Sequence, residues 1–110
     1  FDHLVETAIA KISPRFRRRL KHVAFVVEKE PPKAGLLGLY QGRPLTTRSV
    51  SDGFQMPDTI TIFQGPHERM AIDEDDLRRI VEDTVWHEVA HYFGLNEREV
   101  LRAEKRRGVY

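Results

Sequence analysis

The spacing of apolar residues predicts a helix at the start of the chain. Positions that recur at helical spacing near the N-terminus are Leu4, Val5, Ala8, Ile9 and Ile12. Asp2 is placed to cap this helix and Pro14 to stop it. Residues 14–21 then predict a short surface helix, in which Phe16 and Leu20 anchor a run of basic side chains that stay in solvent.

Three apolar segments in the middle of the chain predict strands. They are Val23–Glu28, residues 36–41 and residues 58–64. The first is apolar on both faces, as in an interior strand, and Gly38 in the second indicates a bulge or an edge position. Gly65 and Pro66 close the third strand, and the polar, irregular residues 42–56 predict a loop.

From Asp73 to Gly94 the pattern is that of a long helix. Asp73 can cap it, and three acidic residues follow in the first turn, at the positive end of the helix dipole. Its inward stripe begins with Leu77, Ile80, Val81 and Thr84 and continues with His87, Glu88 and His91. The helix is therefore expected to enter the interior with three ionisable groups, which need a partner there because burying them alone costs several kcal/mol.

A divalent metal ion is the partner that this pattern predicts. His87 and His91 lie one turn plus about 40° apart, roughly 6 Å along the axis, so both imidazoles can reach one cation. Glu88 lies on the same stripe, within reach of a water held by that ion. This is the H-E-x-x-H arrangement of zinc hydrolases, in which zinc lowers the pKa of water and the glutamate takes its proton.

Composition narrows the function classes further. The 110 residues suffice for one domain, and 18 Lys and Arg against 17 Asp and Glu leave a net charge of +1, which makes nucleic acid an unexpected partner. The absence of cysteine excludes disulfides and thiolate ligands and favours a cytoplasmic protein. The longest apolar run covers residues 23–27, far below the roughly 20 residues of a membrane span, so no membrane partner is expected.

The motif His87-Glu88-x-x-His91-x-x-Gly94-x-x-Glu97 resembles the extended signature of the zincins. Over nearly all of its length the chain resembles a family of small bacterial zincin-like metallopeptidases, the minimal zincins. Segments that carry this resemblance, besides the helical motif, are Val23–Glu28 with Pro31-Pro32, residues 37–42, and residues 57–63 with Gly65-Pro66.

The resemblance implies an α+β fold: a single compact domain over residues 1–110, with a small twisted sheet packed on the metal-binding helix. It implies a Zn²⁺ cofactor and a peptide or protein substrate. In zincins an edge strand pairs with the extended substrate. The substrate-binding residues implied here are Leu36, Leu37, Gly38, Leu39 and Tyr40.

The third metal ligand implied by the motif is Glu97, where the usual residue is His or Asp. A second interpretation keeps Glu97 as a first-turn acid of a last helix, because Asn96 and Glu99 form a capping box. No methionine follows Gly94, so the chain departs from true metzincins, which place a methionine turn there. Candidates for stabilising the oxyanion are His67, Tyr40, Tyr92 and Tyr110.

Two further functions fit parts of the sequence. A metal-dependent endoribonuclease would use a similar histidine spacing, with the basic residues between Arg15 and Lys21 on phosphates. The glutamate after the first histidine and Glu97 in place of a third histidine argue against it. A non-catalytic, metal-stabilised module that binds a peptide without cutting it also suits so small a chain.

Overall fold

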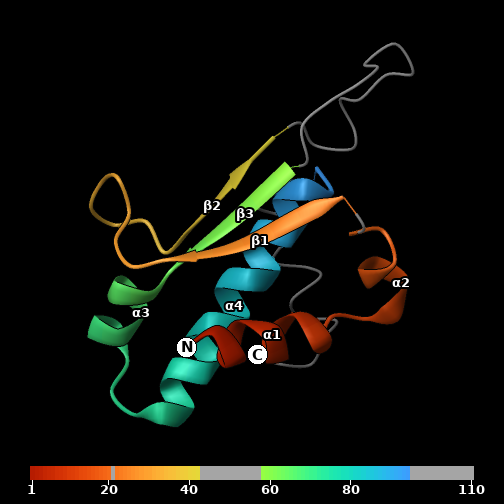
Figure 1. The fold of residues 1–110 in the computed structure, drawn as a ribbon. Helices are drawn as coiled ribbons and strands as arrows, with labels where there is room; N and C mark the ends of the chain where they lie inside the picture. Colours follow the sequence, from red (N-terminus) through yellow and green to blue (C-terminus); the bar gives the residue numbers. More distant parts are fainter. Residues whose placement is uncertain (21, 43–57, 95–110) are drawn as a thin grey trace.

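The computed structural model describes residues 1–20, 22–42 and 58–94. Within these ranges the helices and strands, in chain order, are α1 (Asp2–Ala10), α2 (Pro14–Arg17), β1 (Val23–Glu28), β2 (Gly38–Gln41), β3 (Asp58–Phe63), α3 (Gln64–Met70) and α4 (Glu74–Tyr92). Figure 1 shows their arrangement: α1 lies below the sheet, and α4 runs from the bottom of the view up to the level of the strands.

The described strands form a mixed sheet in the order β1-β3-β2. β1 runs parallel to β3, with Val23 opposite Asp58 and Glu28 opposite Phe63. β2 runs antiparallel to β3, with Gly38 opposite Ile62. β3 is therefore the central strand and β2 an edge strand, as expected for the segment that contains Gly38.

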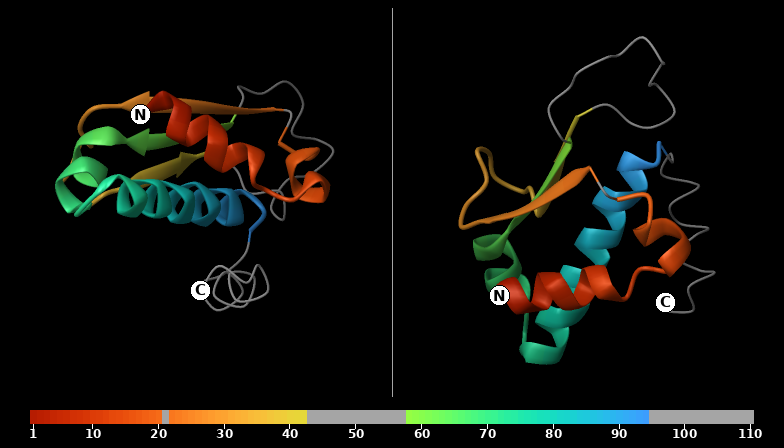
Figure 2. Two further views of the ribbon diagram at one scale, coloured as in Figure 1. Left: turned by 90° about the horizontal axis from the view of Figure 1, so that it is seen from below. Right: turned by 45° about the vertical axis from the view of Figure 1, so that its right-hand side comes forward.

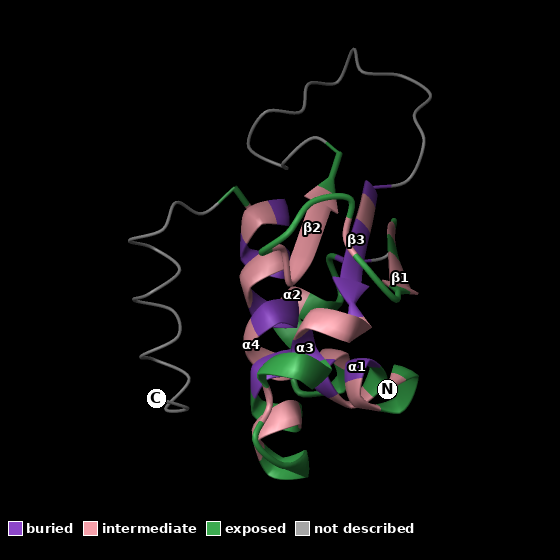
Figure 3. Cartoon of the chain, turned by 90° about the vertical axis from the view of Figure 1, so that its left-hand side faces the viewer, coloured by how far each residue is buried: buried purple, intermediate pink, exposed green. Residues whose placement is uncertain are grey.

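One face of the sheet carries the hydrophobic core. α1 and α4 lie against this same face, as the two views in Figure 2 show. Ile60 and Ile62 of β3 have no exposed surface and belong to one cluster with three residues of α4, Val81, Val85 and Val89. β3 is accordingly the most buried strand in Figure 3. An α+β arrangement with a small sheet packed on the histidine-bearing helix is confirmed.

Helix α4 begins and ends where the sequence predicts. The Asp73 side chain accepts a hydrogen bond of 2.8 Å from the backbone N–H of Asp76, which satisfies one free donor of the first turn. At the other end Gly94 has φ +78°, a left-handed conformation that glycine adopts without strain. These two residues fix the length of the helix and hence the position of its last turns.

Several strand and helix boundaries differ from the prediction. β2 begins only at Gly38 rather than at residue 36. β3 ends at Phe63, because Gln64 already starts α3, a helix that was not predicted. Asp2 lies inside α1, after Phe1 at the cap position. The Gly65-Pro66 pair was interpreted as a turn, but a proline in the first helical turn loses no bond, since the N–H groups there have no acceptor within the helix.

The remaining predictions on the fold have mixed outcomes. The helix at residues 14–21 exists but is short, covering Pro14–Arg17. The predicted loop at residues 42–56 and the predicted last helix lie, apart from Gly42, outside the described residues. None of the described helices is long and apolar enough to cross a membrane.

Candidate metal centre

Three side chains from two adjacent turns of α4 come together. His87, Glu88 and His91 each offer one ligand atom, and these atoms all lie within 4.8 Å of one another. The two imidazole rings meet at a centroid separation of 4.7 Å and an interplanar angle of 76°. The convergence of the histidines that the motif predicts is therefore present in the structure.

The donors in this group are those that zinc prefers. Two imidazole nitrogens and a carboxylate oxygen are typical ligands of Zn²⁺, which in catalytic sites has three protein ligands and one open position. With Glu88 reserved as a base, the helix supplies two ligands, and a third has to come from another segment. The predicted third ligand, Glu97, lies outside the described residues, as does Tyr110.

The face of α4 that carries the histidine pair is only half buried. The residues of these turns that are buried are Val85, Trp86, Val89, Ala90 and Tyr92, whereas His87, Glu88 and His91 are partly exposed. The expectation that the helix carries three ionisable groups into the interior was therefore wrong. The groups lie at the rim of the core, where part of their surface is exposed to solvent.

The edge strand lies directly against this part of the helix. A Cβ atom built on Gly38 would meet Thr84 Cγ2 at 2.8 Å and Glu88 Cγ at 3.0 Å. Both distances are at or below the limit for carbon contacts, so the backbone of β2 approaches α4 as closely as a glycine permits. The predicted edge position of Gly38 therefore has a second function, which is to bring the strand next to the candidate base.

The register of β2 sets the direction of its backbone groups. The Phe63 N–H donates to the Leu37 carbonyl at 3.0 Å. Because hydrogen-bonded and non-hydrogen-bonded pairs alternate in an antiparallel ladder, the N–H and C=O of the next residue, Gly38, point away from β3. They face the outer edge of the sheet, on the side where an extended peptide would add as a further strand.

The other expected substrate-binding residues surround Gly38 in sequence. Leu36 and Leu37 precede the strand, and Leu39 pairs with Thr61. Tyr40 turns towards the helix: its ring packs at 6.0 Å and 77° on Tyr92. Its hydroxyl donates to the buried carboxylate of Asp58 at 2.7 Å.

Two of the residues considered for stabilising the oxyanion are buried and hydrogen-bonded within the protein. His67 is fully buried, and its two ring nitrogens lie 2.6 Å from the Phe63 carbonyl and 2.8 Å from Thr84 Oγ1. Tyr92 is buried and donates to the Arg19 carbonyl at 3.3 Å, which agrees with the packing role expected for it. No feature of the sequence predicts the contact between His67 and Thr84.

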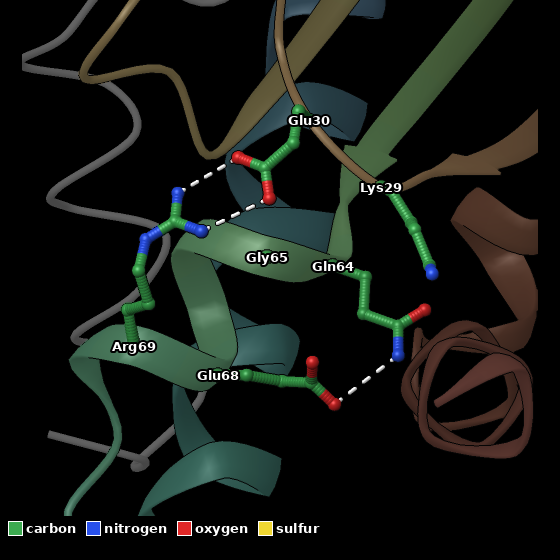
Figure 4. A pocket seen from close by; sticks show the side chains of 6 residues that line it. All are labelled: Lys29, Glu30, Gln64, Gly65, Glu68 and Arg69. Atoms are coloured by element: carbon green, nitrogen blue, oxygen red, sulfur yellow. Dashed lines mark hydrogen bonds and ion pairs between the residues drawn. The ribbon is translucent and has the colours of Figure 1, made fainter.

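A separate surface pocket lies between the segment that follows β1 and helix α3. It measures about 330 Å³ and is lined by Lys29, Glu30, Gln64, Gly65, Glu68 and Arg69. Figure 4 shows that the Arg69 guanidinium binds both oxygens of Glu30, at 2.8 and 2.9 Å. Arg69 lowers the pKa of the Glu30 carboxyl by this hydrogen bonding. No residue of the candidate metal centre lines this pocket.

The sequence matches the family of zincin-like metallopeptidases over residues 20–106. This range contains the three strands of the described residues and the whole of α4. The chain therefore belongs to the zincin-like metallopeptidase family. A search among curated proteins finds no match.

Proposed function

We propose that this protein is a zinc-dependent peptidase that hydrolyses peptide bonds at the histidine pair of α4. The observation that carries the proposal is the convergence of His87, Glu88 and His91 on α4, with Glu88 packed against Gly38 of the edge strand β2. Membership of the zincin-like metallopeptidases supports the same class of reaction. His87 and His91 would hold the ion, and Glu97 is the proposed third ligand.

The ion, when bound, would supply a Lewis acid that acidifies water and polarises the scissile carbonyl. Glu88 acts as general base: its carboxylate accepts a proton from the attacking water while the oxygen adds to the carbonyl carbon. When the C–N bond breaks, the same carboxyl returns that proton to the leaving amine. The hydroxyl group of the water thus ends on the new carboxyl group and its proton on the new amino group, and the Glu88 carboxylate is regenerated.

The proposed substrate is an extended segment of a peptide or protein. The outward groups of Gly38 would pair with its main chain, which fixes the peptide beside Glu88 without requiring a particular side chain. Such pairing holds the scissile bond close to the base and the ion, and positioning of this kind lowers the barrier substantially. Leu36, Leu37, Leu39 and Tyr40 are proposed to line the same strand-like site.

The test replaces Glu88→Gln and measures cleavage of internally quenched peptides of mixed sequence and of unfolded casein. We expect the zinc content to stay at the wild-type level while cleavage falls by at least about 100-fold, as for loss of a general base. Glu74→Gln is the matched control, because it makes the same change at an exposed position of the same helix. Wild-type turnover in Glu88→Gln would refute the assigned base.

The same measurements separate a peptidase from a metal-stabilised binding module. A binding module would bind zinc and retain peptides without cleaving any of them, and removal of its metal would lower the free energy of unfolding. A peptidase loses cleavage when the metal is removed, and cleavage returns when zinc is added back.

A further inference from the structure

His67 is a buried histidine outside the candidate metal centre. It lies on α3, has no exposed surface and contacts two polar groups, the Phe63 carbonyl at 2.6 Å and Thr84 Oγ1 at 2.8 Å. A carbonyl only accepts, so Nδ1 carries the proton and donates to Phe63. Nε2 is then the acceptor and Thr84 Oγ1 the donor. Burial lowers the pKa of His67, consistent with a neutral ring.

Each of these two hydrogen bonds leads to one side of the candidate site. Phe63 ends β3, and its N–H donates to the carbonyl of Leu37, the residue before Gly38. Thr84 belongs to α4 and is one turn before Glu88. His67 is thus linked through Phe63 to the start of the edge strand and through Thr84 to the metal-binding helix.

The two chains of contacts from His67 meet where β2 packs against α4. The methyl group of Thr84 and the Cγ of Glu88 together form the surface against which Gly38 lies, at 2.8 and 3.0 Å from the position of a Cβ. The hydroxyl of Thr84 fixes its side chain through His67, and its methyl group faces Gly38. The rotamer of one buried threonine therefore depends on His67 and in turn determines the separation of β2 and α4.

We propose that His67 is a positioning residue, which through Thr84 sets the distance between the edge strand at Gly38 and the base Glu88. This inference rests on the proposed function, because the distance matters for a peptide paired with β2. A neutral imidazole is costly to bury compared with a leucine. Its two hydrogen bonds join the end of β3 to α4 through polar groups, which an apolar side chain could not do.

The test uses two substitutions of Thr84, which separate the effect of its hydroxyl group from that of its methyl group. Thr84→Val keeps a methyl group towards Gly38 but removes the hydroxyl that donates to His67. Thr84→Ser keeps the hydroxyl and removes the methyl group. His67→Gln is the conservative variant. Its side chain has a donor and an acceptor, so it is expected to retain the hydrogen bonds to Phe63 and Thr84.

Three quantities are measured under conditions in which every variant is folded: kcat/KM for peptide cleavage, zinc affinity by chelator competition, and amide hydrogen exchange. Thr84→Val is expected to lower kcat/KM roughly ten- to a hundredfold, since small misplacements of this kind are costly. Zinc affinity should stay within about twofold, because both histidines remain on one helix. Thr84→Ser keeps the link to His67 but loses the methyl contact with Gly38, so its loss of kcat/KM should be smaller than that of Thr84→Val. His67→Gln should stay close to wild type.

Amide hydrogen exchange tests the positioning role of His67 without requiring that the protein cleave peptides. Amides of residues 36–41 should exchange faster in Thr84→Val than in Thr84→Ser, since only the former loses the link. Unchanged exchange there, or an equal loss of kcat/KM in both Thr84 variants, would overturn the positioning role. If the wild-type protein cleaves no peptide, the proposed function fails, and the exchange rates alone still decide whether His67 positions the strand.

Discussion

Gly38 of the edge strand lies so close to Glu88 that even a methyl group between them would contact the glutamate Cγ at 3.0 Å. The two residues are fifty positions apart in sequence and belong to different elements, β2 and α4. Their contact joins the segment proposed to bind the peptide to the group proposed to activate water. The proposed chemistry therefore depends on a close approach of β2 to α4 that a larger residue at position 38 would disturb.

Gly38→Ala is expected to destabilise the protein and to reduce peptide cleavage. Its Cβ would contact Thr84 Cγ2 at 2.8 Å, and the Thr61 carbonyl 3.3 Å away blocks an easy shift. Overpacking of this kind costs about 1–3 kcal/mol. Urea unfolding of the metal-free protein measures this loss, and a peptide assay measures cleavage.

A double mutant checks the cause of that loss. Thr84→Ser removes a methyl group from the contact, so Gly38→Ala combined with Thr84→Ser should lose less free energy of unfolding than the sum of the two single changes. The expected coupling is about 0.5–3 kcal/mol, as for residues in direct contact. Additive effects would contradict a collision between these two side chains.

His87→Ala and His91→Ala are each expected to abolish tight zinc binding. Even the partners of metal ligands change affinity by 10- to 100-fold, so loss of a ligand should exceed about 100-fold. Equilibrium dialysis followed by metal analysis measures this change. His3→Ala is the control, because His3 is exposed on α1, and zinc retained by all three variants would exclude the histidine pair as the site.

Zinc should stabilise the wild-type protein against unfolding. A ligand that binds only the folded state adds about 2.7 kcal/mol when its free concentration is 100 times Kd. The midpoint of thermal unfolding should therefore rise with zinc concentration in the wild type and stay constant in His87→Ala. A rise of equal size in both proteins would mean that the ion binds elsewhere.

The stability of the protein should depend on pH through His67. Burial lowers its pKa below 6.5 in the folded state, so the unfolded chain binds more protons as the pH falls through 6.5. The contribution of His67 is complete above 6.5 and is lost as the pH falls from there through the folded pKa. The loss amounts to at most about 1.4 kcal/mol per pH unit. His67→Gln should lack this part of the slope in urea unfolding measured between pH 7.5 and 5, and equal slopes would contradict a neutral buried ring.

Helix α4 was the most predictable element, because its signals are local. Asp73 and Gly94 mark its ends, and the five-residue motif fixes which side chains share a face. The spacing could not show how deeply that face is buried, because this depends on where the edge of the sheet passes over it. The ionisable groups were therefore placed too deep.

Contacts between distant segments could not be predicted from periodicity. Nothing near His67 indicates that its ring meets Thr84, since they join through the packing of α3 on α4. α3 itself was missed because Gly65 and Pro66 are also typical turn residues. Gly38 carried a partial signal: a glycine inside a strand indicates a close approach, but the approaching group becomes known only from the structure.

The placement of both histidines on one helix has a consequence for purified samples. Side chains one turn apart keep their mutual geometry whenever that turn is helical, whether or not the sheet still packs above it. A bridging cation would itself favour the helical turn. Under the proposed function, metal content is consequently a poor guide to the activity of a preparation: zinc held by the two histidines would remain in a sample in which the proposed substrate-binding strand no longer packs on α4.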